Sequence, residues 1–196
     1  MFGIDVSHHN GTINWEKVSK NNQKVEFVYI KCSTGVGGFD PKTKENAINA
    51  KKYGIKVGYY HFASMNDEDE VHDAQVEAEW FIKLLKFLPE ADLPLALDIE
   101  EKPSVELDSN EFVNWITVFF KTLDSNGYKN YVLYSYKPYL DEHLPKNHKL
   151  GTIRLWLAQY RPKTTLPNGW NSYWLLQYTD SGKVNGINGS VDLNKG

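Results

Sequence analysis

Acidic side chains end an otherwise apolar segment near the middle of the chain. The segment LPLALDIEE, residues 93–101, has the composition of a buried strand. Side chains alternate between the two faces of a strand, so Leu95 and Leu97 share one face. Asp98 and Glu100 then share the other face. If the leucines pack on helices, both acids point toward the interior of a barrel or sheet, near the carboxyl end of the strand.

Two carboxyl groups in this arrangement suit acid–base chemistry. The strand rise places the Cα atoms of Asp98 and Glu100 about 6–7 Å apart. In an apolar mouth the two groups repel, so that one can keep a proton near neutral pH while the other is charged. An acid beside a carboxylate is what glycosidic bond cleavage uses. The motif alone leaves open an ion pair with Lys or Arg, or the capping of the next helix.

Two further acids occupy similar positions in other apolar segments. Asp5 lies in GIDVSHHNG and Asp192 lies in SVDLN, in the first and last predicted strands. These strands are neighbours if a barrel closes. We therefore expect four acids in one barrel mouth, a costly arrangement that implies a chemical task.

A metal site is the competing task for these acids, with His8, His9 or His61 as additional ligands. The spacings match no compact metal motif, such as two histidines one helical turn apart. The sequence therefore predicts no metal and no cofactor.

Other nucleophile motifs give little support. The chain has no G-x-S-x-G motif, and its single cysteine, Cys32, lies in the strand-like segment FVYIKCSTG without an evident histidine partner. We expect a buried, unreactive thiol. One cysteine also excludes an intrachain disulfide and zinc sites built on several thiolates.

The elements that position these residues alternate along the chain. Helical patterns are expected at 14–21, 41–54, 66–89 and 107–127, with Asp108 or Ser109 as a candidate N-cap of the last. Several strand-like segments are continuous apolar runs, which is typical of parallel strands covered on both faces. These segments are 2–7, 26–33, 56–63, 93–100, 130–136, 153–160, 173–179 and 190–194.

This order predicts an α/β fold, an irregular single-domain β/α barrel of about eight strands over residues 1–196. The last three strands lack full helical crossovers. No glycine-rich nucleotide loop follows the first strand, which disfavours an open doubly wound sheet.

Composition excludes several classes of partner. The net charge is −3 and no basic block occurs, so nucleic acid is not an expected partner. No apolar run is long enough to cross a bilayer, and no signal peptide is visible before MFGIDVSHHN. Aromatic residues make up 14% of the chain, which suits a sugar ligand but equally a large core.

Seven segments together resemble a known family. GIDVSHHNGTINW, YIKCSTG, VGYYHF, LALDIE, LWLAQY, WLLQYT and VDLN occur in this order, as in glycoside hydrolase family 25, the Chalaropsis-type lysozymes. The resemblance covers residues 2–194. It implies an irregular α/β barrel and a β-1,4-N-acetylmuramidase that cleaves bacterial peptidoglycan between N-acetylmuramic acid and N-acetylglucosamine. It also implies action outside the cell or at the cell wall, and we expect a monomer.

The resemblance also implies roles for the four acids. Glu100 falls on the general acid and Asp98 on its partner, whereas Asp5 and Asp192 fall on two further site acids. A retaining route is implied, with the N-acetyl group of the substrate as nucleophile and Asp98 orienting it. Direct nucleophilic attack by Asp98 stays open. Many relatives carry wall-binding repeats that are not visible after VDLNKG in this chain.

Several aromatic and polar residues are expected to bind substrate. By their positions in the family, the resemblance implies that Tyr60, Trp156 and Tyr134 stack on sugar faces, whereas the alternative for each is a core aromatic. Gln177 is polar inside an apolar strand, so it should have a buried partner or face the site. His61 is expected to pack and form hydrogen bonds.

Two other functions fit the same residues less well. One is a metal-dependent polysaccharide deacetylase, which would need bound metal. The other is a catalytically silent barrel that binds peptidoglycan or chitin, which would have no need of a proton donor at position 100.

Overall fold

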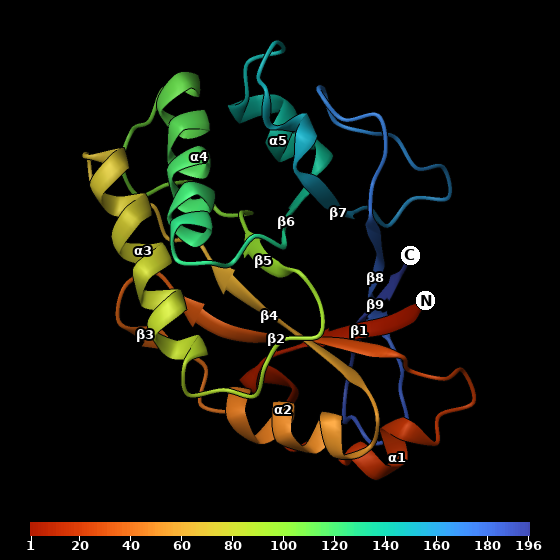
Figure 1. Cartoon of the computed structure of the whole chain (residues 1–196). Helices are drawn as coiled ribbons and strands as arrows, with labels where there is room; N and C mark the ends of the chain where they lie inside the picture. The colour runs from red at the N-terminus through yellow and green to blue at the C-terminus, as the bar shows by residue number, and fades with distance from the viewer.

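The computed structural model describes residues 1–196, and its centre is a closed barrel of eight strands (Figure 1). Closure is made by β1, which pairs with β2 on one side and with β9 on the other. All neighbouring barrel strands are parallel except β9, which is antiparallel to both neighbours. The strands are β1 (Phe2–Val6), β2 (Phe27–Thr34), β4 (Lys56–Phe62), β5 (Leu95–Asp98), β6 (Tyr131–Tyr136), β7 (Arg154–Ala158), β8 (Leu175–Gly182) and β9 (Val191–Lys195), and the short β3 (Gly38–Phe39) pairs with β2 outside the barrel.

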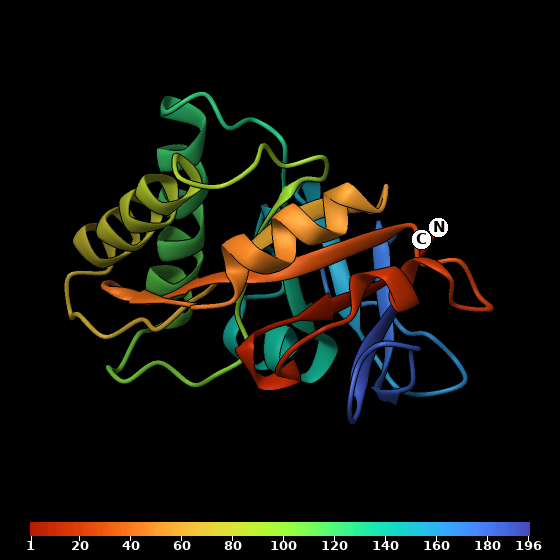
Figure 2. The same cartoon turned by 90° about the horizontal axis from the view of Figure 1, so that it is seen from below.

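Helices cover the outside of the barrel along most of its circumference. Figures 1 and 2 show α3 and α4 on one side and α1 and α2 on another. No helix separates β7 from β8 or β8 from β9, which confirms the expected irregular β/α barrel. None of the helices has the length and apolar composition needed to cross a bilayer. The helices are α1 (Trp15–Ser19), α2 (Thr43–Lys52), α3 (Glu70–Leu85), α4 (Ser109–Ser125) and α5 (Lys137–His143), with short 3₁₀ turns η1 (His8–Asn10) and η2 (Leu150–Thr152).

Four of the five α-helices were predicted, and their starts follow capping rules. Asp108 caps α4 by accepting from the backbone N–H groups of residues 110 and 111, and the Glu111 side chain accepts from its backbone N–H in return. Helix α5 was not predicted. It begins directly after β6 and has only seven residues, too few for a helical apolar period to be recognised.

Alternation along the strands divides the apolar residues into two cores. Leu95, Leu97 and Ile99 belong to the large core between the barrel and its helices. Ala96 lies in the smaller core inside the barrel, together with residues from β2, β6, β7 and β8. The two faces predicted for LALDIE are therefore the faces observed.

Large aromatic rings fill the interior where the neighbouring strand has glycine. Tyr29 on β2 lies beside Gly58 on β4, and its hydroxyl donates to the carbonyl of Pro94 at 2.8 Å. A Cβ built on Gly58 would lie 2.5 Å from the ring of Tyr29. Phe27 and Gly3 form the same combination between β2 and β1. Glycine at these positions leaves the space that the rings occupy.

Gly58→Ala should destabilise the fold by about 1–3 kcal/mol, because the new methyl group must displace a buried ring. Urea unfolding monitored by circular dichroism measures the change. Lys56→Ala, at an exposed position of the same strand, is the control and should stay within about 0.5 kcal/mol of the wild type. If Gly58→Ala were as stable as the wild type, the barrel interior between Gly58 and Tyr29 would not be close-packed.

Candidate active site

One cavity opens at the carboxyl ends of the barrel strands and has a volume of about 520 Å³. Asp98 is the last residue of β5, and Phe62 and Thr34 end the neighbouring strands. This is the end at which β/α barrels place their functional groups. The cavity brings together all eight residues selected from the sequence, namely Asp5, Tyr60, Asp98, Glu100, Tyr134, Trp156, Gln177 and Asp192.

Asp98 and Glu100 approach the cavity from different local structures. Asp98 is held in the sheet and is 5% exposed, whereas Glu100 lies two residues past the strand end and is half-buried. The segment after β5 is fixed by two tyrosines. Tyr136 donates to the carbonyl of Glu100 at 3.3 Å, and Tyr139 donates to the carbonyl of Glu101 at 2.6 Å.

Burial is the main influence on this acid pair. It raises the pKa of Asp98 well above its usual range, and the charge of Glu100 raises it further. Burial also raises the pKa of Glu100, with further contributions from the charges of Asp5 and Glu101. The positive charge of Lys31 opposes both shifts. The buried Oδ1 atom of Asp98 has no hydrogen-bond partner within the chain. The pair therefore binds protons more strongly than free carboxylates do.

Asp5 and Asp192 form a second carboxyl pair at the closure of the barrel. They are directly opposite each other in the β1–β9 pairing, and their carboxyl groups hydrogen-bond to each other. Burial, followed by the charge of Asp5, raises the pKa of Asp192 to about 8. Two N–H donors partly offset the effect of burial on the pKa of Asp5. Asp192 thus holds a proton at neutral pH, where a free aspartate has lost it.

Gln177 is one of the two donors that hold Asp5. Its Oε1 accepts from the hydroxyl groups of Tyr134 at 2.9 Å and Tyr160 at 2.6 Å. These bonds orient the amide so that its Nε2 donates to Oδ2 of Asp5 at 2.9 Å. The expectation that Gln177 has buried partners and faces the site is confirmed.

Asn194 is the second donor, and Trp156 sets its orientation. The indole N–H of Trp156 donates to Oδ1 of Asn194 at 2.7 Å, and Nδ2 of Asn194 donates to Oδ2 of Asp5 at 2.7 Å. Trp156 is 2% exposed, and its ring packs 4.5 Å from that of Tyr29 and 4.7 Å from that of Tyr134. Trp156 therefore forms the floor of the cavity, and sugar stacking by it stays a prediction.

Three residues of the site were missed in the sequence. Lys31 interrupts the apolar segment FVYIKCST and lies 4.3 Å from the ring of Phe62, so a cation in an apolar strand was the available signal. Asn194 closes the segment VDLN and could have been recognised as a polar residue on the same strand face as Asp192. Tyr160 follows the end of β7 at Ala158, and its place on the same face as Trp156 in the predicted strand 153–160 was the available signal.

His61 and His8 do not join the acids, whereas His9 lines the same cavity as they do. His61 lies on the outer face of β4, where Nε2 meets Oε2 of Glu77 and Nδ1 meets Oγ of Ser33, both at 2.7 Å. This confirms that it packs and forms hydrogen bonds. His8 is bound to Asp40 instead. No group of three or more histidine, cysteine, aspartate or glutamate side chains is arranged to hold a metal ion.

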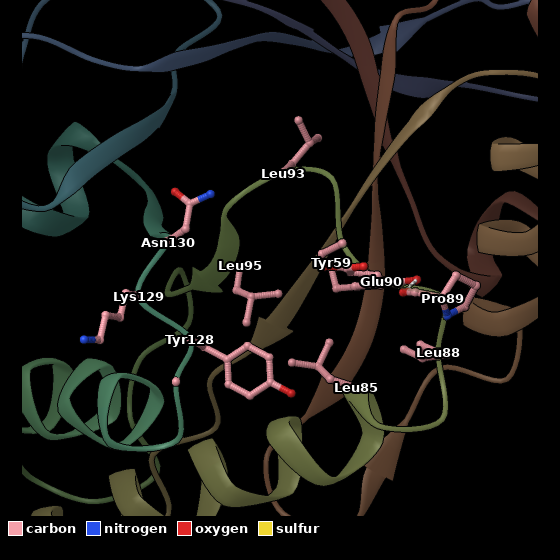
Figure 3. Close-up of a pocket in the computed structure, with 12 residues that line it drawn as sticks. Tyr59, Leu85, Leu88, Pro89, Glu90, Leu93, Leu95, Tyr128, Lys129 and Asn130 are labelled. Atoms are coloured by element: carbon pink, nitrogen blue, oxygen red, sulfur yellow. Dashed lines mark hydrogen bonds between the residues drawn. The ribbon is translucent and has the colours of Figure 1, made fainter.

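A separate cavity of about 480 Å³ lies near the amino-terminal ends of β5 and β6 (Figure 3). In Figure 3 the side chains of Leu85, Leu95 and Tyr128 point toward one another. Its only charged lining residues are Glu90 and Lys129. It has no carboxyl pair and faces away from the carboxyl ends of the strands, so it offers no comparable chemistry.

A closed β/α barrel with two carboxyl pairs at the carboxyl ends of its strands is the arrangement of a glycosidase barrel. Residues 4–187 match the sequence profile of the glycosyl hydrolases family 25. The chain belongs to this family, and the resemblance read from the seven segments is confirmed.

Individual relatives agree with this assignment. The chain is 32% identical to the autolytic lysozyme of Clostridium acetobutylicum over 195 residues, which are 100% of this chain but 55% of that protein. The crystal structure of the bacterial lysozyme from Streptomyces coelicolor is similar with a TM-score of 0.87 and 28% identity, and the match covers 100% of this chain and 91% of that one. The modular autolysin LytC of Streptococcus pneumoniae, in complex with a synthetic peptidoglycan ligand, has a TM-score of 0.86 and 28% identity over 98% of this chain and 46% of that one.

Asp192→Asn should change how stability depends on pH. A carboxyl group whose pKa rises from 3.8 in the unfolded chain to about 8 in the folded protein stabilises the fold at low pH. This contribution is lost as pH rises from about 4 through about 8. The wild type should therefore lose more thermal stability than Asp192→Asn between pH 5 and pH 9 in melting experiments.

Glu68→Gln removes an exposed acid in the connection between β4 and α3 and serves as the control. It should keep the wild-type pH dependence. Parallel curves for the wild type and Asp192→Asn would contradict the raised pKa of Asp192 in the folded protein.

Proposed function

We propose that the protein hydrolyses the β-1,4 bond between N-acetylmuramic acid and N-acetylglucosamine in bacterial peptidoglycan. The observation that carries the proposal is the Asp98–Glu100 pair, with the pKa of both groups raised, at the mouth of a family 25 barrel. Related proteins named lysozyme and a related autolysin with a bound peptidoglycan ligand support the same substrate. The protein would act at the cell wall as a monomer.

Glu100 acts as the general acid. Its raised pKa keeps a proton on the carboxyl group at the pH where a free glutamate has lost it. Its half-buried position past the strand end lets it reach the glycosidic oxygen, to which it gives this proton as the bond breaks. The resulting carboxylate then takes a proton from the water that attacks the sugar in the second step.

Asp98 assists the N-acetyl group of the muramic acid. Its Oδ1 lacks a partner within the chain and can accept the amide N–H of the substrate. The N-acetyl oxygen attacks the anomeric carbon and gives an oxazolinium-like species with positive charge, which favours the ionised form of Asp98. Water then opens this species with net retention of configuration, a recorded exception to the scheme with two catalytic carboxylates.

Asp192 and Lys31 make the surroundings of Asp98 less negative at neutral pH. The proton that Asp192 keeps at neutral pH removes one negative charge from the cavity, and Lys31 compensates part of the remainder. The ionised Asp98 therefore forms in a less negative field than four free carboxylates would create. Asp5, Asp192, Tyr60 and Tyr134 line the space in which the sugar would bind.

Glu100→Gln should lower the turnover number on purified peptidoglycan by about 10²–10⁴-fold, because the amide cannot transfer the proton. Release of new reducing ends measures the rate. The matched control is Glu106→Gln, which alters an exposed glutamate in the same segment and should keep full activity. Near-normal turnover of a folded Glu100→Gln protein would remove Glu100 from the role of general acid.

Asp98→Asn should lower the turnover number by at least about 10²-fold, because a neutral amide cannot stabilise the developing positive charge. On de-N-acetylated peptidoglycan the wild type should itself be slow, and the substitution should cost little more. An equal additional loss on both substrates would show that Asp98 acts without the N-acetyl group.

A further inference from the structure

Another cavity, of about 740 Å³, adjoins the active-site cavity and differs from the one in Figure 3. We call the active-site cavity the first cavity and this one the second cavity. It shares Glu100, Tyr134 and Tyr160 with the first cavity, but neither Asp98 nor the Asp5–Asp192 pair lines it. Its other walls come from the start of α5 and from the segment that follows β7. Oδ1 of Asp141 on α5 accepts the backbone N–H of Asn168, which joins α5 to the connection between β7 and β8.

The position of the second cavity relative to Glu100 indicates which part of the substrate the cavity would hold. A general acid donates its proton to the oxygen of the leaving sugar, so this sugar must lie on the side of Glu100 that faces away from Asp98. Asp98 belongs with the sugar that is attacked. The cavity that contains Glu100 without Asp98 is therefore on the leaving-group side.

Tyr160 forms a rigid wall between the two cavities. Half of the residue is exposed, yet its hydroxyl is anchored to the buried Gln177 at 2.6 Å. The ring is thus held in one orientation while part of its surface stays open. An aromatic residue with an apolar body and a bonded polar end suits packing against a sugar ring.

Arg161 supplies a free positive charge to the same cavity. It forms no ion pair, whereas Lys137, the other cation in the lining, is paired with Asp141. The planar guanidinium group fits a carboxylate through two parallel hydrogen bonds. Gln159 and Thr165 close the segment around Arg161, because Nε2 of Gln159 donates to Oγ1 of Thr165 at 3.1 Å and the Thr165 N–H donates to Oε1 of Gln159 at 2.7 Å.

We propose that the second cavity binds the leaving-group side of the glycan, where Tyr160 packs against the leaving N-acetylglucosamine and Arg161 pairs with a peptide-stem carboxylate on the next muramic acid. This inference rests on the proposed function. It makes Arg161 a residue that distinguishes peptidoglycan from an uncharged glycan such as chitin. Arg161 is the unpaired cation of this cavity, whose other charged lining residues are Glu100 and the Lys137–Asp141 ion pair.

The test compares Arg161→Ala with the wild type on two substrates. One is soluble peptidoglycan fragments with free stem carboxylates, and the other is the same fragments with these carboxylates converted to amides. On free carboxylates, Arg161→Ala should raise KM roughly 10-fold with little change in kcat, because the lost bond forms in both ground and transition states. On amidated fragments the two proteins should have the same KM.

Lys163→Ala is the matched control, since Lys163 is an exposed cation in the same segment that lines neither cavity. It should behave as the wild type on both substrates. Tyr160→Phe, which keeps the ring, should retain a lower KM than Tyr160→Leu. Melting temperatures verify that each variant is folded.

Equal KM values for the wild type and Arg161→Ala on free carboxylates, with normal cleavage by the wild type, would overturn the inference and leave the proposed function intact. A higher KM for Arg161→Ala that persists unchanged on amidated fragments would also overturn it, because the stem carboxylates would not be the partner. If the wild type releases no fragments from either substrate, the proposed function fails and the inference fails with it.

Discussion

Burying several carboxyl groups in one barrel mouth is the constraint on which the rest of the interior depends. Burial is the largest influence on the pKa of all four acids, and it acts against their charged forms. The compensation for Asp5 comes from Gln177 and Asn194, two amides that are themselves buried in an otherwise apolar space. These amides in turn need donors, which tyrosine and tryptophan side chains provide. The aromatic interior is thus also the support of the charged site.

The two carboxyl pairs are buried in different surroundings, and this difference suits the proposed reaction. Asp5 and Asp192 face each other across the barrel closure, and Asp192, with its pKa raised to about 8, keeps its proton at neutral pH. Asp98 and Glu100 lie at and past a strand end, where Glu100 is open to substrate and Oδ1 of Asp98 is left without a partner. In the proposed reaction the second pair carries the proton transfer, and the first pair stays fixed in the sheet.

The sequence predicted much of this arrangement, because alternation along a buried strand is a strong signal. The two faces of LALDIE followed from it, whereas the eight strands followed from their apolar runs, and the closure that joins Asp5 to Asp192 followed from the order of strands and helices. Short or irregular elements did not. Helix α5 is too short to show a helical period, and Arg161 lies past the end of β7, where position in the chain does not determine direction. The hydrogen bond from the indole N–H of Trp156 to Asn194 joins residues that are 38 positions apart in the sequence. It therefore depends on how the strands are arranged in the barrel.

Product analysis by mass spectrometry tests the central claim most directly. Purified peptidoglycan would be digested with the protein, and the new reducing ends labelled by reduction with borodeuteride. The account predicts that every labelled end is a muramic acid, because the bond broken lies between N-acetylmuramic acid and N-acetylglucosamine. Labelled N-acetylglucosamine, or a glycan that has lost acetyl groups but remains uncut, would contradict it.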